Sequence, residues 1–76
     1  MSLIINYLNK HLMIHFSDII NHANIIISNE KENTIINEFS IDNKDFINLK
    51  LSLDSGNYQI KIIQKEEELL KSIIVK

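Results

Sequence analysis

The stretch His11-Leu12-Met13-Ile14-His15-Phe16 carries the clearest structural signal in the sequence, a strict alternation of two kinds of side chain. Successive residues of a β-strand point to opposite faces, so the Leu, Ile and Phe side chains share one face. The two His side chains and the Met side chain share the other face. This stretch therefore predicts a β-strand with one side in a hydrophobic core.

Further apolar runs, rich in isoleucine, lie on both sides of this stretch, and polar clusters separate them. Seven runs can be recognised, at residues 3–8, 11–16, 23–28, 34–41, 46–52, 58–63 and 69–75. Their starts are 8 to 12 residues apart, a spacing typical of strands and turns in a sandwich. We therefore predict an all-β fold, a seven-stranded antiparallel β-sandwich formed by one domain, residues 1–76. Turns are expected at residues 9–10, 29–33, 42–45, 54–57 and 65–68.

Residues 62–74 leave a helical alternative open. Their apolar side chains also recur at spacings of three, four and seven, around a stretch of good helix formers. The β-branched residues on both sides of Lys65–Glu68 favour a β-hairpin instead. The hairpin is the preferred prediction, with the helix as its alternative.

The composition argues against two classes of partner. The net charge is −2, with eight Lys, no Arg and no basic cluster, so a nucleic-acid interface is not expected. No apolar run approaches the roughly 20 residues of a membrane-spanning helix. Because the chain has no Cys, disulfides cannot help a domain of this size, and aliphatic packing must supply its core.

Residues that could carry chemistry are few, and each has a simpler structural interpretation. On a strand, His11 and His15 are about 13 Å apart, too far to share a zinc ion. His22 is expected in a loop, and Glu66–Glu68 at a hairpin tip. Asp42–Asp45 lacks the Gly and the distal Glu of an EF-hand calcium loop. We therefore predict no catalytic, metal-binding or cofactor-binding residues, and a protein that is not an enzyme.

A family resemblance begins at Leu53-Asp54-Ser55-Gly56-Asn57-Tyr58-Gln59-Ile60. A turn with the only Gly of the chain is followed by Tyr58 and then by the inward position Ile60. This pattern resembles the tyrosine corner of immunoglobulin-like domains, in which the Tyr hydroxyl bonds to backbone upstream. Gly56 and Tyr58 are thus predicted to form a structural turn, with a positive φ at Gly56.

Over residues 8–76 the chain is similar to small immunoglobulin-like domains of Bacteroidota. Two groups share the pattern, the C-terminal sorting domain of the type IX (Por) secretion system and short secreted proteins of unknown function from gut Bacteroides. The sorting domain has a Pro-rich start that is missing here, and the secreted group has glycines where this chain has Asn29–Asn33. The resemblance implies an immunoglobulin-like sandwich and a secreted or envelope location if the chain is processed from a precursor. If Met1 is the native start, the location stays open, because residues 1–6 do not resemble a secretory signal.

Three functions follow as hypotheses. The first is a non-enzymatic interaction or structural module of the bacterial cell envelope or secreted fraction. The alternatives are a virion decoration or assembly subunit of a phage infecting such bacteria, and a type IX sorting domain.

Doubled isoleucines suggest how such a module would bind. In a two-faced strand every second residue should be polar, yet pairs such as Ile62-Ile63 and Ile73-Ile74 force one Ile outward. We predict a protein partner, or self-association, through a sheet face or an edge strand that lacks Pro. The face is expected to carry Met13, Ile26, Ile63 and Ile74.

Overall fold

The computed structural model describes residues 2–76, and within that range every regular element is a β-strand. The strands are β1 (Leu3–Leu8), β2 (His11–Asn29), β3 (Thr34–Lys50), β4 (Gly56–Gln64) and β5 (Glu67–Val75). The predicted all-β class is confirmed. The helical alternative for residues 62–74 is wrong, because β4 and β5 pair as a hairpin.

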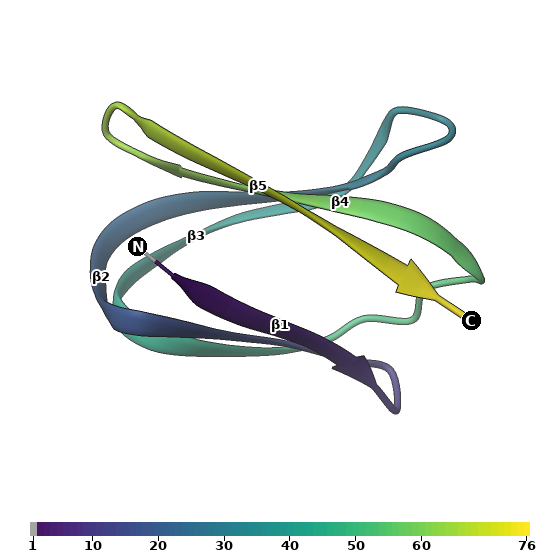
Figure 1. The fold of residues 1–76 in the computed structure, drawn as a ribbon, viewed down its shortest axis with the longest axis horizontal. Coiled ribbons are helices and arrows are strands. Elements are labelled where there is room, and N and C mark those ends of the chain that lie inside the picture. Colours follow the sequence, from purple (N-terminus) through teal and green to yellow (C-terminus); the bar gives the residue numbers. More distant parts are fainter. Residues whose placement is uncertain (1) are drawn as a thin grey trace.

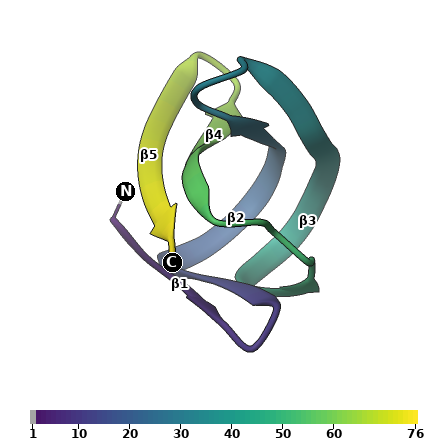
Figure 2. The same ribbon diagram turned by 90° about the vertical axis from the view of Figure 1, so that its right-hand side faces the viewer.

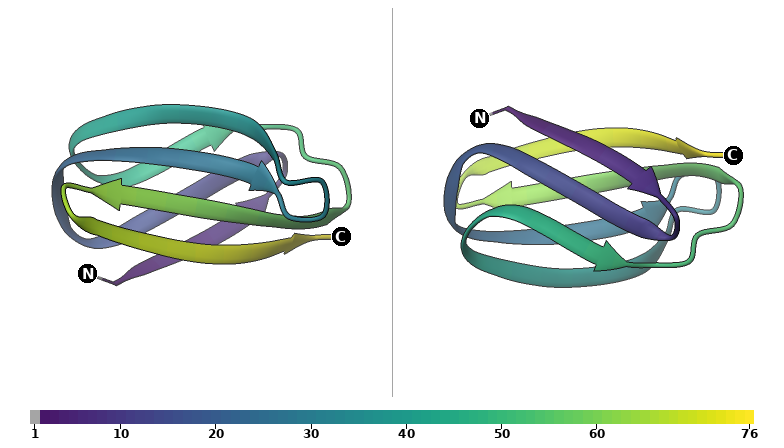
Figure 3. Two further views of the ribbon diagram at one scale, coloured as in Figure 1. Left: turned by 90° about the horizontal axis from the view of Figure 1, so that it is seen from above. Right: turned by 90° about the horizontal axis from the view of Figure 1, so that it is seen from below.

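All strand pairs are antiparallel and belong to one sheet. Its order is β1-β2-β4-β5, and β3 pairs along the other side of β2. The long strand β2 pairs with β1 over its first half, with β4 over its second half, and with β3 over most of its length. Figure 3 shows β3, β2, β4 and β5 side by side in one view, and β1 beside β2 in the other. β2 is therefore the central strand of the fold.

The prediction of seven strands is wrong, because two pairs of apolar runs are joined into single long strands. Runs 11–16 and 23–28 are the two halves of β2, and runs 34–41 and 46–52 supply most of β3. The polar segments between them remain in the sheet. A turn was expected at residues 42–45, yet these residues continue β3. Polar residues suit a turn and a solvent-facing strand bend equally well, so local composition does not separate the two.

Local irregularities bend both long strands at the same place. Between the pairs His15–Phe46 and Ile20–Lys44, residues 16–19 of β2 lie opposite the single residue 45 of β3. Extra residues of this kind bend a strand and increase its twist. Nearby in β3, Asn43 has a φ of 51°, a left-handed conformation that Asn tolerates. The two strands accordingly curve together, as the left side of Figure 1 and the end view of Figure 2 show.

The bend brings side chains from both halves of the sheet into one hydrophobic core. The inward residues predicted at the start of β2 are buried, with Leu12 and Ile14 at 0% and Phe16 at 3% exposure. They share one cluster with residues from the second half of β2, from β3 and from β4, namely Ile20, Ala23, Ile25, Ile27, Ile41, Ile47, Ile60 and Ile62. The radius of gyration is 11.8 Å, close to the about 11.4 Å expected for a compact domain of this length.

Two-residue loops close the terminal hairpins. Asn9 and Lys10 have φ values of 52° and 65° and connect β1 to β2. Positive φ at both central residues belongs to the turn type whose twist matches that of paired strands. Lys65, with a φ of 40°, opens the other loop, between β4 and β5. The turns expected at residues 9–10 and 65–68 are therefore present, the second of them shorter than expected.

Two tyrosines hold the connection between β3 and β4, residues 51–55. The Tyr7 hydroxyl donates a hydrogen bond of 2.6 Å to the Leu51 carbonyl oxygen and accepts one of 2.9 Å from the Leu53 N–H. The Tyr58 hydroxyl donates a bond of 2.7 Å to the carbonyl oxygen of Asp54, the backward contact that a tyrosine corner makes. The connection is thus tied to β1 at one end and to β4 at the other.

Gly56 stands at the end of this connection with a φ of 155°. A Cβ added there would meet only Tyr58 Cε1, at 3.9 Å, so space does not require a glycine. The backbone conformation does, because L-residues rarely adopt that φ.

Candidate interaction surfaces

A row of one aliphatic and two aromatic side chains crosses the outer face of the sheet where β1, β2 and β3 pair. Ile4 lies opposite His15, and His15 lies opposite Phe46. We call these three residues the aromatic row, after its two aromatic members, His15 and Phe46. Ile4 is 66% and Phe46 is 44% exposed, and His15 is exposed as well.

The aromatic row is ordered by a contact between two rings. The His15 and Phe46 ring centroids are 5.6 Å apart, with an interplanar angle of 67°, so one ring edge faces the other ring. Such edge-to-face pairs stabilise their own geometry beyond the area that they bury. The row therefore presents a preformed surface of one aliphatic and two aromatic side chains to solvent.

Polar side chains flank the aromatic row on the same face. The next row contains Asn6, Met13 and Asn48, and the one after it contains Leu8, His11 and Lys50. His11 Nδ1 and Asn48 Oδ1 are joined by a hydrogen bond of 2.8 Å. His11 and His15 thus share a face, as their spacing predicted, but each has its own partner on β3.

The four predicted interface residues do not form one contiguous surface. Met13 lies in the first half of β2, beside the aromatic row. Ile26 lies in the second half of β2, beyond the bend, where its neighbours across the strands are Glu38 of β3 and Lys61 of β4. Ile63 is diagonal to Ile26 on the paired strand β4. Both Ile26 and Ile63 are only half-buried.

Ile74 is the most exposed of the four, at 72%. It pairs with Asn57 at the far end of β4 from Ile63, so polar residues separate it from the other apolar groups. The remaining strongly exposed apolar side chains are Leu8, Ile19, Ile35, Ile36 and Leu70.

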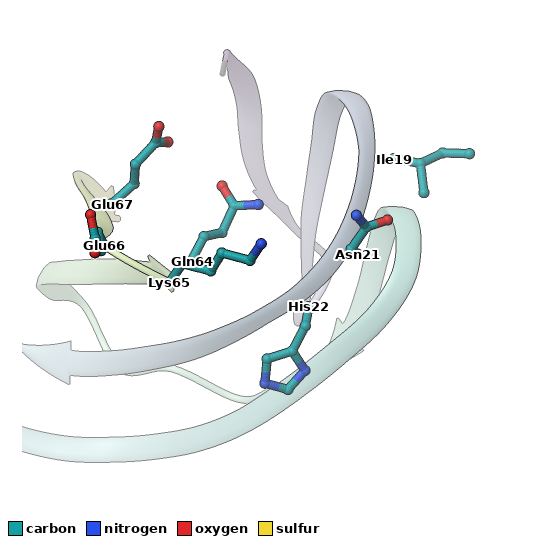
Figure 4. Close-up of a pocket in the computed structure, with 7 residues that line it drawn as sticks. All are labelled: Ile19, Asn21, His22, Gln64, Lys65, Glu66 and Glu67. Carbon is teal, nitrogen blue, oxygen red and sulfur yellow. The ribbon is translucent and has the colours of Figure 1, made fainter.

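A shallow hollow of about 630 Å³ lies between the bend of β2 and the β4–β5 hairpin. Ile19, Asn21 and His22 line one side, and residues 64–67 line the other. In Figure 4 the Lys65 side chain reaches toward β2, whereas the Glu67 carboxylate points away from His22. Of the carboxylates expected at a hairpin tip, Glu66 lies in the loop and Glu67 begins β5, and both line the hollow. Glu68 lies within β5, where its carboxylate is 3.1 Å from Lys61 Nζ.

His22 also forms the only His–carboxylate pair among residues 2–76. Its Nδ1 is 2.7 Å from Asp42 Oδ1, and the two side chains are 60% and 68% exposed. The pair is a strand-to-strand contact, because His22 and Asp42 lie opposite each other in the β2–β3 ladder. His22 is thus in a strand and not in the expected loop. Water surrounds both groups, so the pair lacks the desolvated setting in which catalytic dyads work.

The free edges of the sheet differ in charge. β1, with the sequence Leu3-Ile4-Ile5-Asn6-Tyr7-Leu8, has no charged residue and pairs only with β2 in the part of the chain that the structure describes. β5 has Glu67 and Glu68 at its start. It also has Lys71 opposite the buried Ile60, on the core-facing side. An inward-pointing charge on an edge strand opposes pairing with another chain.

Residues 2–76 contain no helix long and apolar enough to cross a membrane. Within the same residues, no three His, Asp or Glu side chains are grouped as metal ligands.

Sequence reasoning missed Tyr7, Ile4 and Phe46. Ile4 and Phe46 belong to runs that predict ordinary strands, and only strand pairing places them in one row. Tyr7 lacks the preceding Gly-containing turn that marks Tyr58, so nothing in the local sequence indicates that its hydroxyl reaches residues 51–53.

Comparison with known proteins adds no relative. No protein-family model matches the chain, and no curated protein matches it significantly.

Proposed function

We propose that this chain is a non-enzymatic interaction or structural module that binds a protein, at the bacterial cell envelope or in the secreted fraction. The aromatic row is the observation that carries the proposal. It places an aliphatic, an imidazole and a phenyl side chain side by side on a sheet face, in contact with solvent. Aromatic side chains in a preformed arrangement are the usual anchors of protein interfaces.

The polar surroundings of the row suit such an interface. Asn6, Asn48 and Lys50 lie on the same face, and a polar rim around an apolar centre is the common anatomy of protein–protein contacts. Phe46 is also held by His15, so binding would cost little side-chain ordering at this position.

The fold proposed with this function is an immunoglobulin-like β-sandwich in which β2 and β3 each pass through the bend as one continuous strand. The Tyr58 hydroxyl bond to the Asp54 carbonyl supports it, since the tyrosine corner is a feature of that fold. The envelope or secreted location is supported by the sequence resemblance of residues 8–76.

A comparison of two surface variants tests the binding function. Phe46→Lys removes the centre of the aromatic row at an already exposed position, and Ile74→Lys is the matched control on β5, where exposure is 72%. We expect a protein captured from the source bacterium by the parent chain to be lost with Phe46→Lys and retained with Ile74→Lys. Circular dichroism of all three chains verifies that they are folded. Equal capture by all three, or turnover of a substrate by the parent, would contradict the proposal.

A further inference from the structure

We propose that β1 is a homodimerisation edge, where it pairs antiparallel with β1 of a second copy in a register centred on Asn6. This inference deepens the proposed function and rests on it, since it names a second copy of the chain as a partner of the module.

Among residues 2–76, no strand pairs with the outer edge of β1. The Ser17 N–H donates a hydrogen bond of 2.9 Å to the Ser2 carbonyl, and hydrogen-bonded pairs alternate along an antiparallel ladder. Even-numbered residues of β1 therefore bond to β2. The N–H and C=O groups of Leu3, Ile5 and Tyr7 point away from β2, toward the free edge.

Charge distinguishes this edge from the others. No residue of β1 is charged, so an approaching copy meets neither repulsion nor a buried charge. β5, by contrast, carries Lys71 on the core-facing side, and Glu67 and Glu68 at its start. β3 carries five charged residues, Glu38, Asp42, Lys44, Asp45 and Lys50. Charged edges are protected against pairing, and an uncharged edge without Pro is open to it.

The side chains of β1 are complementary to themselves in one register. The burial alternates along the strand, with Ile4, Asn6 and Leu8 on the outer face. Two antiparallel copies that keep their outer faces on the same side must pair even-numbered with even-numbered residues. Centred on Asn6, the pairing sets Ile4 opposite Leu8 of the second copy and Asn6 opposite its own equivalent. Apolar groups then meet apolar groups, and amide meets amide.

One neighbouring register shows why the pairing centred on Asn6 is favoured. Centred on Ile5, it sets Ile4 opposite Asn6 of the second copy and Leu8 opposite Ser2, so that every apolar side chain on the outer face meets a polar one. In the proposed register, the free backbone groups of Ile5 and Tyr7 bond to Tyr7 and Ile5 of the second copy. Ile4 and Leu8, which are 66% and 62% exposed in the single chain, become covered.

In the proposed pairing each aromatic row continues into the Leu8–His11 row of the other copy, so both aromatic rows lie on one outer face. Ile4 is the last residue of its row at the β1 edge. Opposite it would stand Leu8 of the second copy, followed by that copy's His11. The sheet would continue across the two-fold axis with the outer faces of both copies on one side.

A cysteine placed at the axis gives a direct test. The chain has no Cys of its own, so any disulfide in an Asn6→Cys variant joins two copies. In the proposed register the two Cys would be a non-hydrogen-bonded pair, whose Cα separation of about 4.5 Å lies within the range of disulfides. We expect rapid formation of a covalent dimer under mild oxidation. Ser72→Cys, at an exposed outer position of β5, is the control for random collision and should stay mostly monomeric.

Opposite charges at the same position give a second test without covalent chemistry. Asn6→Lys or Asn6→Asp places like charges opposite each other, so each variant alone should be monomeric by light scattering. An equimolar mixture of the two should recover the dimer. The parent should be dimeric at high micromolar concentration.

Several outcomes would overturn the inference. They are a parent that is monomeric at every concentration, equal crosslinking of Asn6→Cys and Ser72→Cys, or a dimer that Asn6→Lys does not weaken. Capture of an extended segment of another protein at β1 in place of a second copy would also overturn it. If the dimer fails while Phe46→Lys still abolishes capture of a protein, the proposed function stands without this inference.

Discussion

Tyr7 and Tyr58 hold the same connecting segment from opposite sides of the fold. Tyr7 reaches it from β1 through hydrogen bonds to Leu51 and Leu53, and Tyr58 reaches it from β4 through a bond to Asp54. Both tyrosines are tied to backbone, so their hydroxyls satisfy groups of a segment that lies outside the strand ladders. The segment is thereby fixed although none of it belongs to a strand.

The first prediction is that Tyr7→Phe destabilises the fold more than Tyr58→Phe. Loss of the Tyr7 hydroxyl leaves an N–H and a carbonyl without a partner, and we expect a cost of about 1–3 kcal/mol in the free energy of unfolding. Tyr58→Phe removes one bond and should cost about 0.5–1.5 kcal/mol. Urea denaturation measures both. Equal midpoints for the two variants would contradict the role assigned to Tyr7.

The second prediction concerns Gly56. Because φ is 155° and no atom crowds the added Cβ, Gly56→Ala should destabilise through backbone strain alone, by more than about 1 kcal/mol. Gly56→Val should cost at least as much. An unchanged denaturation midpoint in both variants would mean that the turn relaxes without loss.

The third prediction concerns the bend of β3 at Asn43. Its φ of 51° is accessible to Asn and Gly but strained for a β-branched residue. Asn43→Gly should therefore leave stability nearly unchanged, whereas Asn43→Val should lower it by about 1–2 kcal/mol. Thermal unfolding of the pair provides the measurement, with the Gly variant as the matched control. Equal melting temperatures would argue that β3 can bend without a left-handed residue.

The fourth prediction concerns Lys71, the inward charge on β5. Replacing it in Lys71→Ile removes the feature that protects this edge, and should produce new self-association while the fold persists. Lys71→Arg, which keeps the charge, is the control. Sedimentation of the parent and the two variants would decide, and a Lys71→Ile chain that sediments like the parent would show that the charge is not protective.

The fifth prediction is that the His22–Asp42 pair matters little for stability. Both side chains are more than half exposed, and exposed ion pairs contribute about 0–1 kcal/mol. Asp42→Asn should therefore shift the urea midpoint only slightly. A large loss would mean that the pair supports the strand bend.

Side-chain alternation, which the sequence alone contains, determined the β class of this protein. Leu12, Ile14 and Phe16 were assignable to the core because the period of a strand is local, and they are buried. The apolar runs of the sequence predicted the strand segments, and turn-forming residues predicted loops at 9–10 and 65–68, the second of which is only residues 65–66 in the structure.

Strand pairing, which only the tertiary structure contains, decided how those runs connect and what the surface looks like. Residues 17–22, which are polar except for Ile19 and Ile20, and the polar residues 42–45 mark the bend, and local composition does not distinguish such a bend from a turn. The aromatic row joins Ile4, His15 and Phe46 from three strands. The register of the row is fixed because all three strands must keep their buried side chains in the core. A slip of one strand by a single residue would turn its buried side chains toward solvent.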